Sequence, residues 1–308
     1  MEGKEICTDI DGNVYETVLI GDQCWMLENL KTTHYRDGTP IPHVTGTTAW
    51  EALSTGAYCE YGNNLSNVST YGRMYNWYAV DDAHGLAPDG WHVATDDDWK
   101  QLEMHLGMSE ALVDSRGGYR GTNEGSKLAG RADLWRDYGG ALETDSEFGT
   151  SGFTALPGGM RRPGGSFDGI DYYTYFWSSP EDSSTSAWGC GLLYNYSDVF
   201  RGSYGKRYGF SVRCVKIMKQ GNKRKMTGAL TVQEQVEIFR ENIEKVYLDA
   251  PTSCGGSFGE ILCYELHSQP VNPRLPGDTG LTFEELAGKW GITLPFLGAL
   301  IKDHCEKL

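Results

Sequence analysis

The chain has 308 residues, a formal net charge of −15 and an aromatic content of 12%. This length allows about two domains. The sequence has no long apolar run and starts without an apolar leader core, so neither a membrane span nor a signal peptide is expected. The negative charge argues against a general nucleic-acid binder and against an anionic membrane surface, so neither is expected as a partner.

Residues 1–217 predict an α+β domain of short strands and long loops. Residues 14–20 alternate as a strand does, and the segment from Thr95 to Gly107 predicts a helix. Thr95 suits the N-cap, acidic residues follow it at the positive end of the helix dipole, and Gly107 suits the end. Further strands are expected at 175–179, 187–194 and 209–217, and turns at the Gly/Pro-rich stretch 151–167.

A change of composition near residue 218 predicts a second domain. Residues 218–226 are basic and are expected to form a linker. Residues 227–308 predict a small all-α domain, because apolar residues recur there at helical spacing. Within it, 283–302 has helix-turn-helix-like spacing, but its outward positions are mostly apolar rather than basic. Self-association or contact with a carrier structure is therefore favoured over DNA binding.

No motif in the sequence assembles a catalytic or metal site. Residues 9–16 resemble a calcium loop, but Gly12 comes too early for an EF-hand, so a turn is expected. The acidic residues 96–98 are explained by helix capping. The eight cysteines form no CxxC pair, and buried free thiols are expected, with one or two disulfides as the alternative. The interpretation is a protein that is not an enzyme, without catalytic residues, cofactor or metal.

Six segments in order resemble one known family. They read "DIDGNVYETVLIGDQCWMLENLKT", "DGTPIP", "YGRMYNWYAV", "GLAPDGWHVATDDDW", "SGFTALPGG" and "YGFSVRCVK". Together they resemble the Fibrobacter succinogenes major paralogous domain over about residues 5–217. That family is similar to the C-type lectin fold and to its formylglycine-generating enzyme branch. The resemblance implies a mixed domain with a compact core and a broad loop-bearing face. The calcium-binding EPN and WND motifs of sugar-binding C-type lectins are absent, which argues against calcium-dependent sugar binding.

Some members of this family resemble the variable proteins of diversity-generating retroelements, in which template adenines are randomised during reverse transcription. Asn codons are the usual targets, and their randomisation never yields Trp, Met, Lys, Glu or Gln. All fourteen variable positions chosen between 189 and 208 obey this rule, and a second set lies at 168–175. The resemblance thus implies twenty ligand-binding variable residues: Asp168, Ile170, Asp171, Tyr172, Tyr173, Tyr175, Gly189, Cys190, Gly191, Leu193, Asn195, Tyr196, Asp198, Phe200, Gly202, Ser203, Tyr204, Gly205, Arg207 and Tyr208.

The residues between the variable positions are expected to hold the scaffold. We expect Arg201 and Lys206 to be structural, and the variable positions to form one contiguous, solvent-exposed face rich in tyrosine. The buried scaffold is expected to include Trp177, Trp188, Leu192, Val199 and Val212.

Three functional interpretations follow. The first is a receptor-binding protein, associated with a phage or a retroelement, that presents a diversified surface to a protein or glycan on a cell surface. A virion or a cell surface would be its location. The second is a surface adhesion or carbohydrate-binding protein that is not diversified. The third is a formylglycine-generating-type enzyme, for which Cys190 and Cys214 are the candidate cysteine pair.

Overall fold

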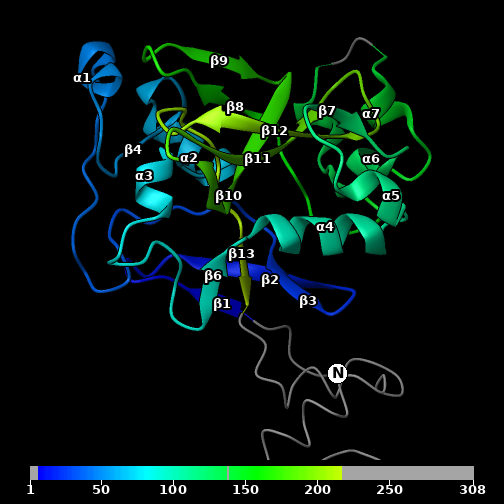
Figure 1. Ribbon diagram of the computed structural model, residues 1–308, viewed down its shortest axis with the longest axis horizontal. Coiled ribbons are helices and arrows are strands. Elements are labelled where there is room, and N and C mark those ends of the chain that lie inside the picture. Colours follow the sequence, from blue (N-terminus) through cyan, green and yellow to red (C-terminus); the bar gives the residue numbers. More distant parts are fainter. Residues whose placement is uncertain (1–5, 137–138, 217–308) are drawn as a thin grey trace, which may run out of the picture. The chain divides into compact units, whose positions relative to one another are not determined.

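The computed structural model describes residues 6–136 and 139–216, which are coloured by sequence in Figure 1. The chain divides into two units after Met218. The basic linker predicted at 218–226 and the helical domain predicted at 227–308 lie outside the described residues, so the association expected there stays a prediction. Within the described part, no helix is long and apolar enough to cross a membrane.

The described residues form a mixed domain rich in β-strand, with two main sheets and mostly short helices. The five-stranded sheet has the order β1-β2-β3-β13-β6, and the six-stranded sheet has the order β7-β12-β11-β10-β8-β9. The first contains β1 (Ile6–Thr8), β2 (Val14–Ile20), β3 (Gln23–Met26), β6 (Trp91–Val93) and β13 (Cys214–Lys216). The second contains β7 (Gly118–Arg120), β8 (Gly158–Arg161), β9 (Phe167–Ile170), β10 (Tyr173–Ser183), β11 (Ser186–Leu193) and β12 (Val199–Gly205).

The remaining elements are small. A separate two-stranded sheet pairs β4 (Tyr58–Cys59) with β5 (Met74–Tyr75). The α-helices are α1 (Thr47–Glu51), α2 (Val68–Tyr71), α3 (Trp77–Val80), α4 (Asp96–His105), α5 (Glu110–Val113), α6 (Glu124–Leu128) and α7 (Ala141–Thr144). Single 3₁₀ turns occur at Tyr61–Asn63, Leu65–Asn67 and Ala132–Leu134. Figure 1 shows α1–α3 at one end of the six-stranded sheet and α5–α7 at the other.

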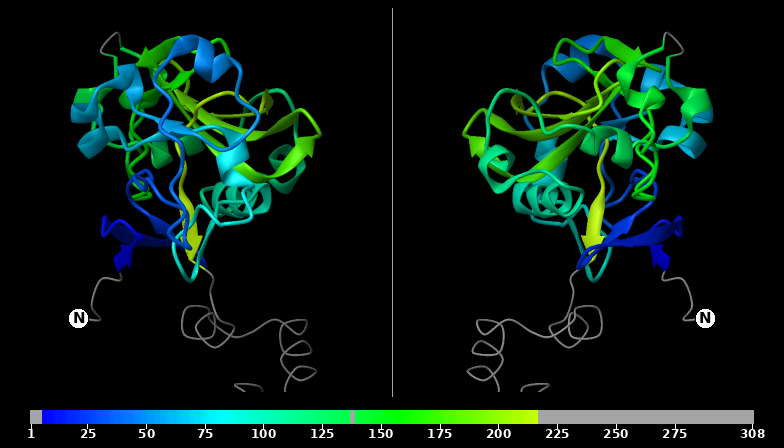
Figure 2. Two further views of the ribbon diagram at one scale, coloured as in Figure 1. Left: turned by 90° about the vertical axis from the view of Figure 1, so that its left-hand side faces the viewer. Right: turned by 90° about the vertical axis from the view of Figure 1, so that its right-hand side faces the viewer.

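The last described strand, β13, lies inside the five-stranded sheet, between β3 and β6. β13 runs antiparallel to both β3 and β6, with Val215 opposite Trp25 on one side and His92 on the other. Figure 2 shows that β13 and the N-terminal hairpin of β1 and β2 lie at the same end of the domain. The predicted strand at 14–20 is confirmed, and the predicted closing strand is confirmed over its last part.

Helix α4 is confirmed with the predicted cap. The Thr95 hydroxyl accepts a hydrogen bond from the Asp98 backbone N–H at 3.0 Å, and the Asp98 carboxylate accepts one from the Thr95 backbone N–H at 2.8 Å. This reciprocal capping box satisfies two backbone donors that the first turn of a helix leaves free. Trp99 and Leu102 face the core, as their spacing predicted.

The prediction of turns at 151–167 is wrong in part: residues 151 and 163–164 are turns, but β8 and the first residue of β9 also fall in this stretch. Its glycines and prolines suggested turns, yet Arg161 is fully buried there. The Arg161 guanidinium donates to the backbone carbonyls of Val44 at 2.6 Å and Thr45 at 2.7 Å, and lies 4.3 Å above the Trp50 ring. These contacts with a distant loop hold a glycine-rich segment in an extended conformation.

The six-stranded sheet separates two hydrophobic clusters. Phe176 and Trp177 are neighbours on β10, so they point to opposite faces, and each belongs to a different cluster. All five scaffold residues named above, Trp177, Trp188, Leu192, Val199 and Val212, are buried. The five cysteines of the described part, Cys7, Cys24, Cys59, Cys190 and Cys214, are free and buried, as expected. Cys254, Cys263 and Cys305 lie outside the described residues.

Candidate functional site

Aromatic side chains gather on one face of the six-stranded sheet. Tyr173 and Tyr175 alternate with buried Thr174 and Phe176 along β10, and Tyr175, Gly191 and Phe200 lie opposite one another on β10, β11 and β12. Side chains at such positions point to the same side of a sheet. We call this surface the aromatic face; its members are Tyr119, Tyr173, Tyr175, Tyr196, Phe200, Tyr204 and Tyr208.

Tyr175 lies at the centre of the aromatic face. Its ring centroid is 5.4 Å from that of Tyr173, 5.3 Å from that of Tyr204 and 6.2 Å from that of Phe200, all in edge-to-face geometry. Tyr208 joins through Tyr204 at 5.6 Å. Such pairs add about 0.5–1.5 kcal/mol to the energy of burial. The rings therefore support one another as a connected layer.

One member of the aromatic face was missed from the sequence. Tyr119 of β7 stacks on Tyr196 with centroids 4.0 Å apart and meets Phe200 edge to face at 5.3 Å. Its strand is only three residues long and joins the sheet by pairing with β12, where Tyr119 lies opposite Phe200. No local sequence pattern predicts a strand pairing between residues that are eighty positions apart.

The prediction that all variable positions face solvent is wrong in part. Of the fourteen at 189–208, five are exposed, five are half-buried and four are buried. The exposed ones are Asn195, Tyr196, Ser203, Gly205 and Arg207, and the half-buried ones are Leu193, Asp198, Phe200, Tyr204 and Tyr208. Of the buried ones, Gly189, Gly191 and Gly202 lie close beneath rings of the aromatic face.

Cys190 is the clear exception. Its side chain points away from the aromatic face into the core, where its Sγ lies 3.9 Å from Oε1 of the buried Glu103. Burial and the Glu103 charge raise the pKa of this thiol well above its ordinary value. Cys190 is opposite Arg201 in the sheet, and both belong to the face that packs inward. A ligand at the aromatic face cannot reach it.

The second variable set is split between two places. All six residues at 168–175 are half-buried, but only Tyr173 and Tyr175 belong to the aromatic face. Tyr172 packs edge to face on Tyr194 at 5.5 Å and beneath the Arg136 guanidinium at 4.7 Å. Asp168 pairs with Arg162, Asp171 pairs with Arg136 at 3.3 Å, and the Ile170 N–H donates to the Tyr61 hydroxyl. Tyr173 and Tyr175 of this set therefore lie in the aromatic face, whereas Asp171 and Tyr172 lie in a second cluster with Arg136.

Arg201 and Lys206 are bound within the fold. The Arg201 guanidinium donates two hydrogen bonds to the Asp96 carboxylate, at 2.7 and 2.5 Å, and lies 3.9 Å above the Trp188 ring. The Lys206 ammonium pairs with Glu181 and lies 4.5 Å above the Trp77 ring. Their charges are thus used inside the domain, which agrees with the structural role expected for both.

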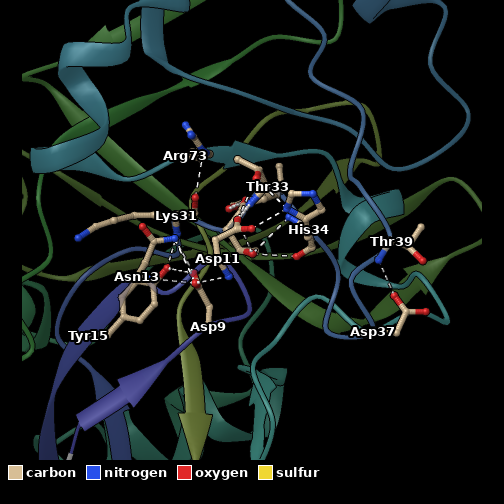
Figure 3. Close-up of polar contacts among 12 residues, drawn as sticks. Asp9, Asp11, Asn13, Tyr15, Lys31, Thr33, His34, Asp37, Thr39 and Arg73 are labelled. Atoms are coloured by element: carbon tan, nitrogen blue, oxygen red, sulfur yellow. Dashed lines mark hydrogen bonds and ion pairs between the residues drawn. The ribbon is translucent and has the colours of Figure 1, made fainter.

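The acidic loop at 9–16 is the expected turn (Figure 3). Asp9 accepts hydrogen bonds from the backbone N–H groups of Asp11 and Asn13 and from the Tyr15 hydroxyl at 2.6 Å. Asp11 accepts from Thr33 and from Nδ1 of His34 at 2.5 Å. Protein donors therefore occupy both carboxylates. Over residues 6–136 and 139–216, no group of side chains has the composition of a metal site.

Comparison with known proteins gives one match. Residues 18–216 match the family described as the Fibrobacter succinogenes major domain, and this is more than half of the chain. No curated protein and no solved structure matches the sequence. The matched region includes the whole six-stranded sheet, all members of the aromatic face and the five-stranded sheet except β1 and the start of β2. The chain belongs to the Fibrobacter succinogenes major domain family.

Proposed function

We propose that this domain binds a protein or glycan on a cell surface through the aromatic face, and that retroelement mutagenesis diversifies this face. The observation that carries the proposal is a connected layer of seven aromatic rings on one side of the six-stranded sheet, six of them half-buried and Tyr196 exposed. Aromatic residues dominate binding hot spots, and tyrosine offers a large contact area at low entropic cost. A partly exposed apolar layer of this kind usually marks an interaction site, because a bound partner removes the rings from water.

The alternation of β11 and β12 supports diversification. Trp188, Leu192 and Val199, which were assigned to the scaffold, lie on the core side. Gly191 and Phe200, which were assigned as variable, lie on the other side. A mutagenic process confined to such positions changes the surface while leaving the core residues in place.

Neighbouring DNA provides the first test. We expect a near-copy of the segment encoding residues 168–217, beside a reverse transcriptase gene, with Asn codons at the variable positions. A copy with Asn codons at the core-side positions 188, 192 and 199 would contradict the proposal. Absence of any copy would favour the alternative, a binding protein whose aromatic face is fixed.

A display library provides the second test. Randomising Tyr196, Phe200 and Tyr208 together is expected to give folded variants, some of which bind a chosen target such as hen lysozyme. The matched control randomises the core-side residues Trp188, Leu192 and Val199, and we expect it to give almost no folded protein. Equal loss of folding in both libraries would refute a separable binding face.

We infer further that the scaffold is C-type lectin-like. Its support is a mixed domain with a compact core and one broad face, as the resemblance of the sequence implied. An experimental structure superposed on C-type lectin-like domains is the direct test. A different strand order around β13 would contradict this inference.

The enzyme alternative receives no support from its two cysteines. Cys190 and Cys214 belong to different hydrophobic clusters, and both are buried. Burial raises the pKa of both thiols well above the ordinary value. The thiolate is the reactive form of cysteine, so neither residue is prepared to act as a nucleophile.

A further inference from the structure

Three glycines of the six-stranded sheet lie directly beneath rings of the aromatic face. A β-carbon added at Gly191 would lie 2.6 Å from Cδ1 and Cε1 of Tyr175, and one at Gly202 would lie 2.7 Å from Cε1 of Phe200. At Gly189 the nearest atom would be Cδ2 of Tyr204, at 3.1 Å. Carbon atoms pack at about 3.5–4.0 Å, so the rings occupy the space that a side chain would need.

The backbone itself does not require glycine at these three positions. None of them has the positive φ that disfavours other residues. The nearest backbone atoms to the added β-carbons are the Thr174 carbonyl oxygen at 3.2 Å from Gly191 and the Phe176 carbonyl oxygen at 3.3 Å from Gly189. At Gly191 and Gly202 the ring atoms are the nearest by far, so the ring is the main obstacle to a side chain, whereas at Gly189 ring and backbone are almost equally near.

A displaced ring has no space on its inner side. Tyr175 is stacked on Phe210 with centroids 5.1 Å apart, and Tyr204 meets the same ring edge to face at 4.9 Å. Phe210 and Trp177 behind it are fully buried, with ring centroids 4.4 Å apart. Protein cores are packed to crystal-like density. A Tyr175 or Tyr204 ring pushed from its glycine must therefore turn outward to solvent. The Phe200 ring is bounded by the rings of Tyr119, Tyr175 and Tyr204 instead.

We propose that Gly191, Gly202 and Gly189 set the shape of the aromatic face, and thereby what it binds, by leaving room for the rings of Tyr175, Phe200 and Tyr204 close against the sheet. A side chain at one of these glycines displaces the ring above it, so that the ring projects farther from the sheet. This rests on the proposed function, because it describes how the same face takes different shapes. One substitution then changes two positions of the ligand-binding surface.

Four glycine-to-alanine variants differ in how far the new carbon overlaps a ring, and their losses of Tm should follow that order. In Gly191→Ala and Gly202→Ala the overlap is severe, in Gly189→Ala it is mild, and in Gly205→Ala nothing lies within 4 Å of the new carbon. Gly205 lies on the same strand as Gly202 and is the matched control. We expect Tm to fall by about 3–6 °C for the first two, by less for the third and not at all for the control.

Ring exposure is measured directly by nitration with tetranitromethane and peptide mass spectrometry. In Gly191→Ala we expect nitration of Tyr175 to rise several-fold, with no rise in Gly205→Ala. Burial raises the pKa of the Tyr175 hydroxyl, so its ultraviolet titration is expected to move back toward the ordinary tyrosine value in the same variant. Unchanged nitration and titration of Tyr175 would overturn the proposal.

A double substitution covers the case in which Gly191→Ala does not fold. In the Tyr175→Ala background the ring is absent, so adding Gly191→Ala is expected to leave Tm within about 1 °C. An equal loss of Tm with and without the ring would refute the coupling. None of these measurements involves a ligand, so a failure of the proposed function leaves their outcome unchanged, and their failure leaves the binding tests unchanged.

Discussion

The two faces of the six-stranded sheet are built from the same strands but by different chemistry. The inward face includes two buried ion pairs, Arg120 with Glu103 and Arg201 with Asp96. The aromatic face consists of rings and contains no charged member. A buried ion pair needs both partners, whereas a ring contact can be replaced by another apolar contact. Tolerance to substitution should therefore differ sharply between residues one position apart.

The largest effect is expected at Arg120. Its guanidinium contacts Glu103 at 2.5 and 2.9 Å, and both side chains are almost completely buried. Arg120→Met leaves the Glu103 carboxylate unpaired in the core, so we expect the free energy of unfolding to fall by about 3–5 kcal/mol. Urea denaturation measures it. The double variant Arg120→Met/Glu103→Met should recover most of the loss, and a double variant as unstable as the single one would contradict the explanation.

The second-largest loss of stability is expected for Arg201→Ala, and a smaller one for Lys206→Ala. Arg201→Ala removes two charge-assisted hydrogen bonds to Asp96 and the contact with Trp188, for an expected loss of about 2–3 kcal/mol. Lys206→Ala removes a pair with the half-exposed Glu181, and we expect about 1 kcal/mol or less. Thermal and urea unfolding of both variants test the order. A larger loss of stability for Lys206→Ala than for Arg201→Ala would contradict this order.

The pair of Asp96 with Arg201 also predicts a pH dependence. Burial acts to raise the pKa of Asp96, but hydrogen bonds from Arg201 and Lys100 outweigh it and the pKa lies below its ordinary value. The stabilisation is therefore present above the unfolded pKa of about 4 and is lost as pH falls through the lower folded value. We expect Asp96→Asn to destabilise the protein more at neutral pH than near pH 2.5.

Urea midpoints at the two pH values measure this difference for Asp96→Asn. Asp97→Asn is the control, because Asp97 is on the same helical turn and its side chain is 84% exposed. A gap between wild type and Asp96→Asn that stayed constant with pH would contradict the assignment of the effect to this carboxylate.

Local features were predictable from the sequence. The capping residues of α4 and the alternation of β2 depend on neighbours within a few positions, and both were found. The alternation of scaffold and variable residues at 188–203 also agrees with the two sides of β11 and β12, except at Cys190 and Ser203. The codon rule permits cysteine at position 190 but does not say to which side of the sheet its side chain points. That side is set by the strand register, which places Cys190 opposite Phe176 and Arg201.

Long-range features were not predictable. Tyr119 reaches the aromatic face only because β7 pairs with β12. The strand β8 was missed because its extended shape depends on Arg161 binding carbonyls more than one hundred residues away. In both cases the deciding contact joins segments that no local pattern relates. The assignment of variable residues therefore needed the structure to separate outward from inward positions.

The smallest effect per substituted residue is expected for the exposed variable positions. Asn195→Ser, Tyr196→Ser, Ser203→Asn and Arg207→Ser combined remove one stacked ring contact, one hydrogen bond to Asp182 and one to the Glu51 carbonyl. Each change at an exposed site is worth at most about 0.5 kcal/mol, and the ring contact adds about as much again. We expect a combined loss of about 1–2 kcal/mol, with Tm lower by about 2–8 °C.

The matched control changes four core-side residues of β11 and β12 to alanine, at 188, 190, 192 and 199. All four are buried, and large-to-small changes in a core cost several kcal/mol in total, about 2–5 for each leucine-sized side chain. This variant is expected not to fold at room temperature, as judged by circular dichroism. If the exposed set proved as disruptive as the buried set, these variable positions would be part of the core, and diversification could not occur at them without loss of the fold.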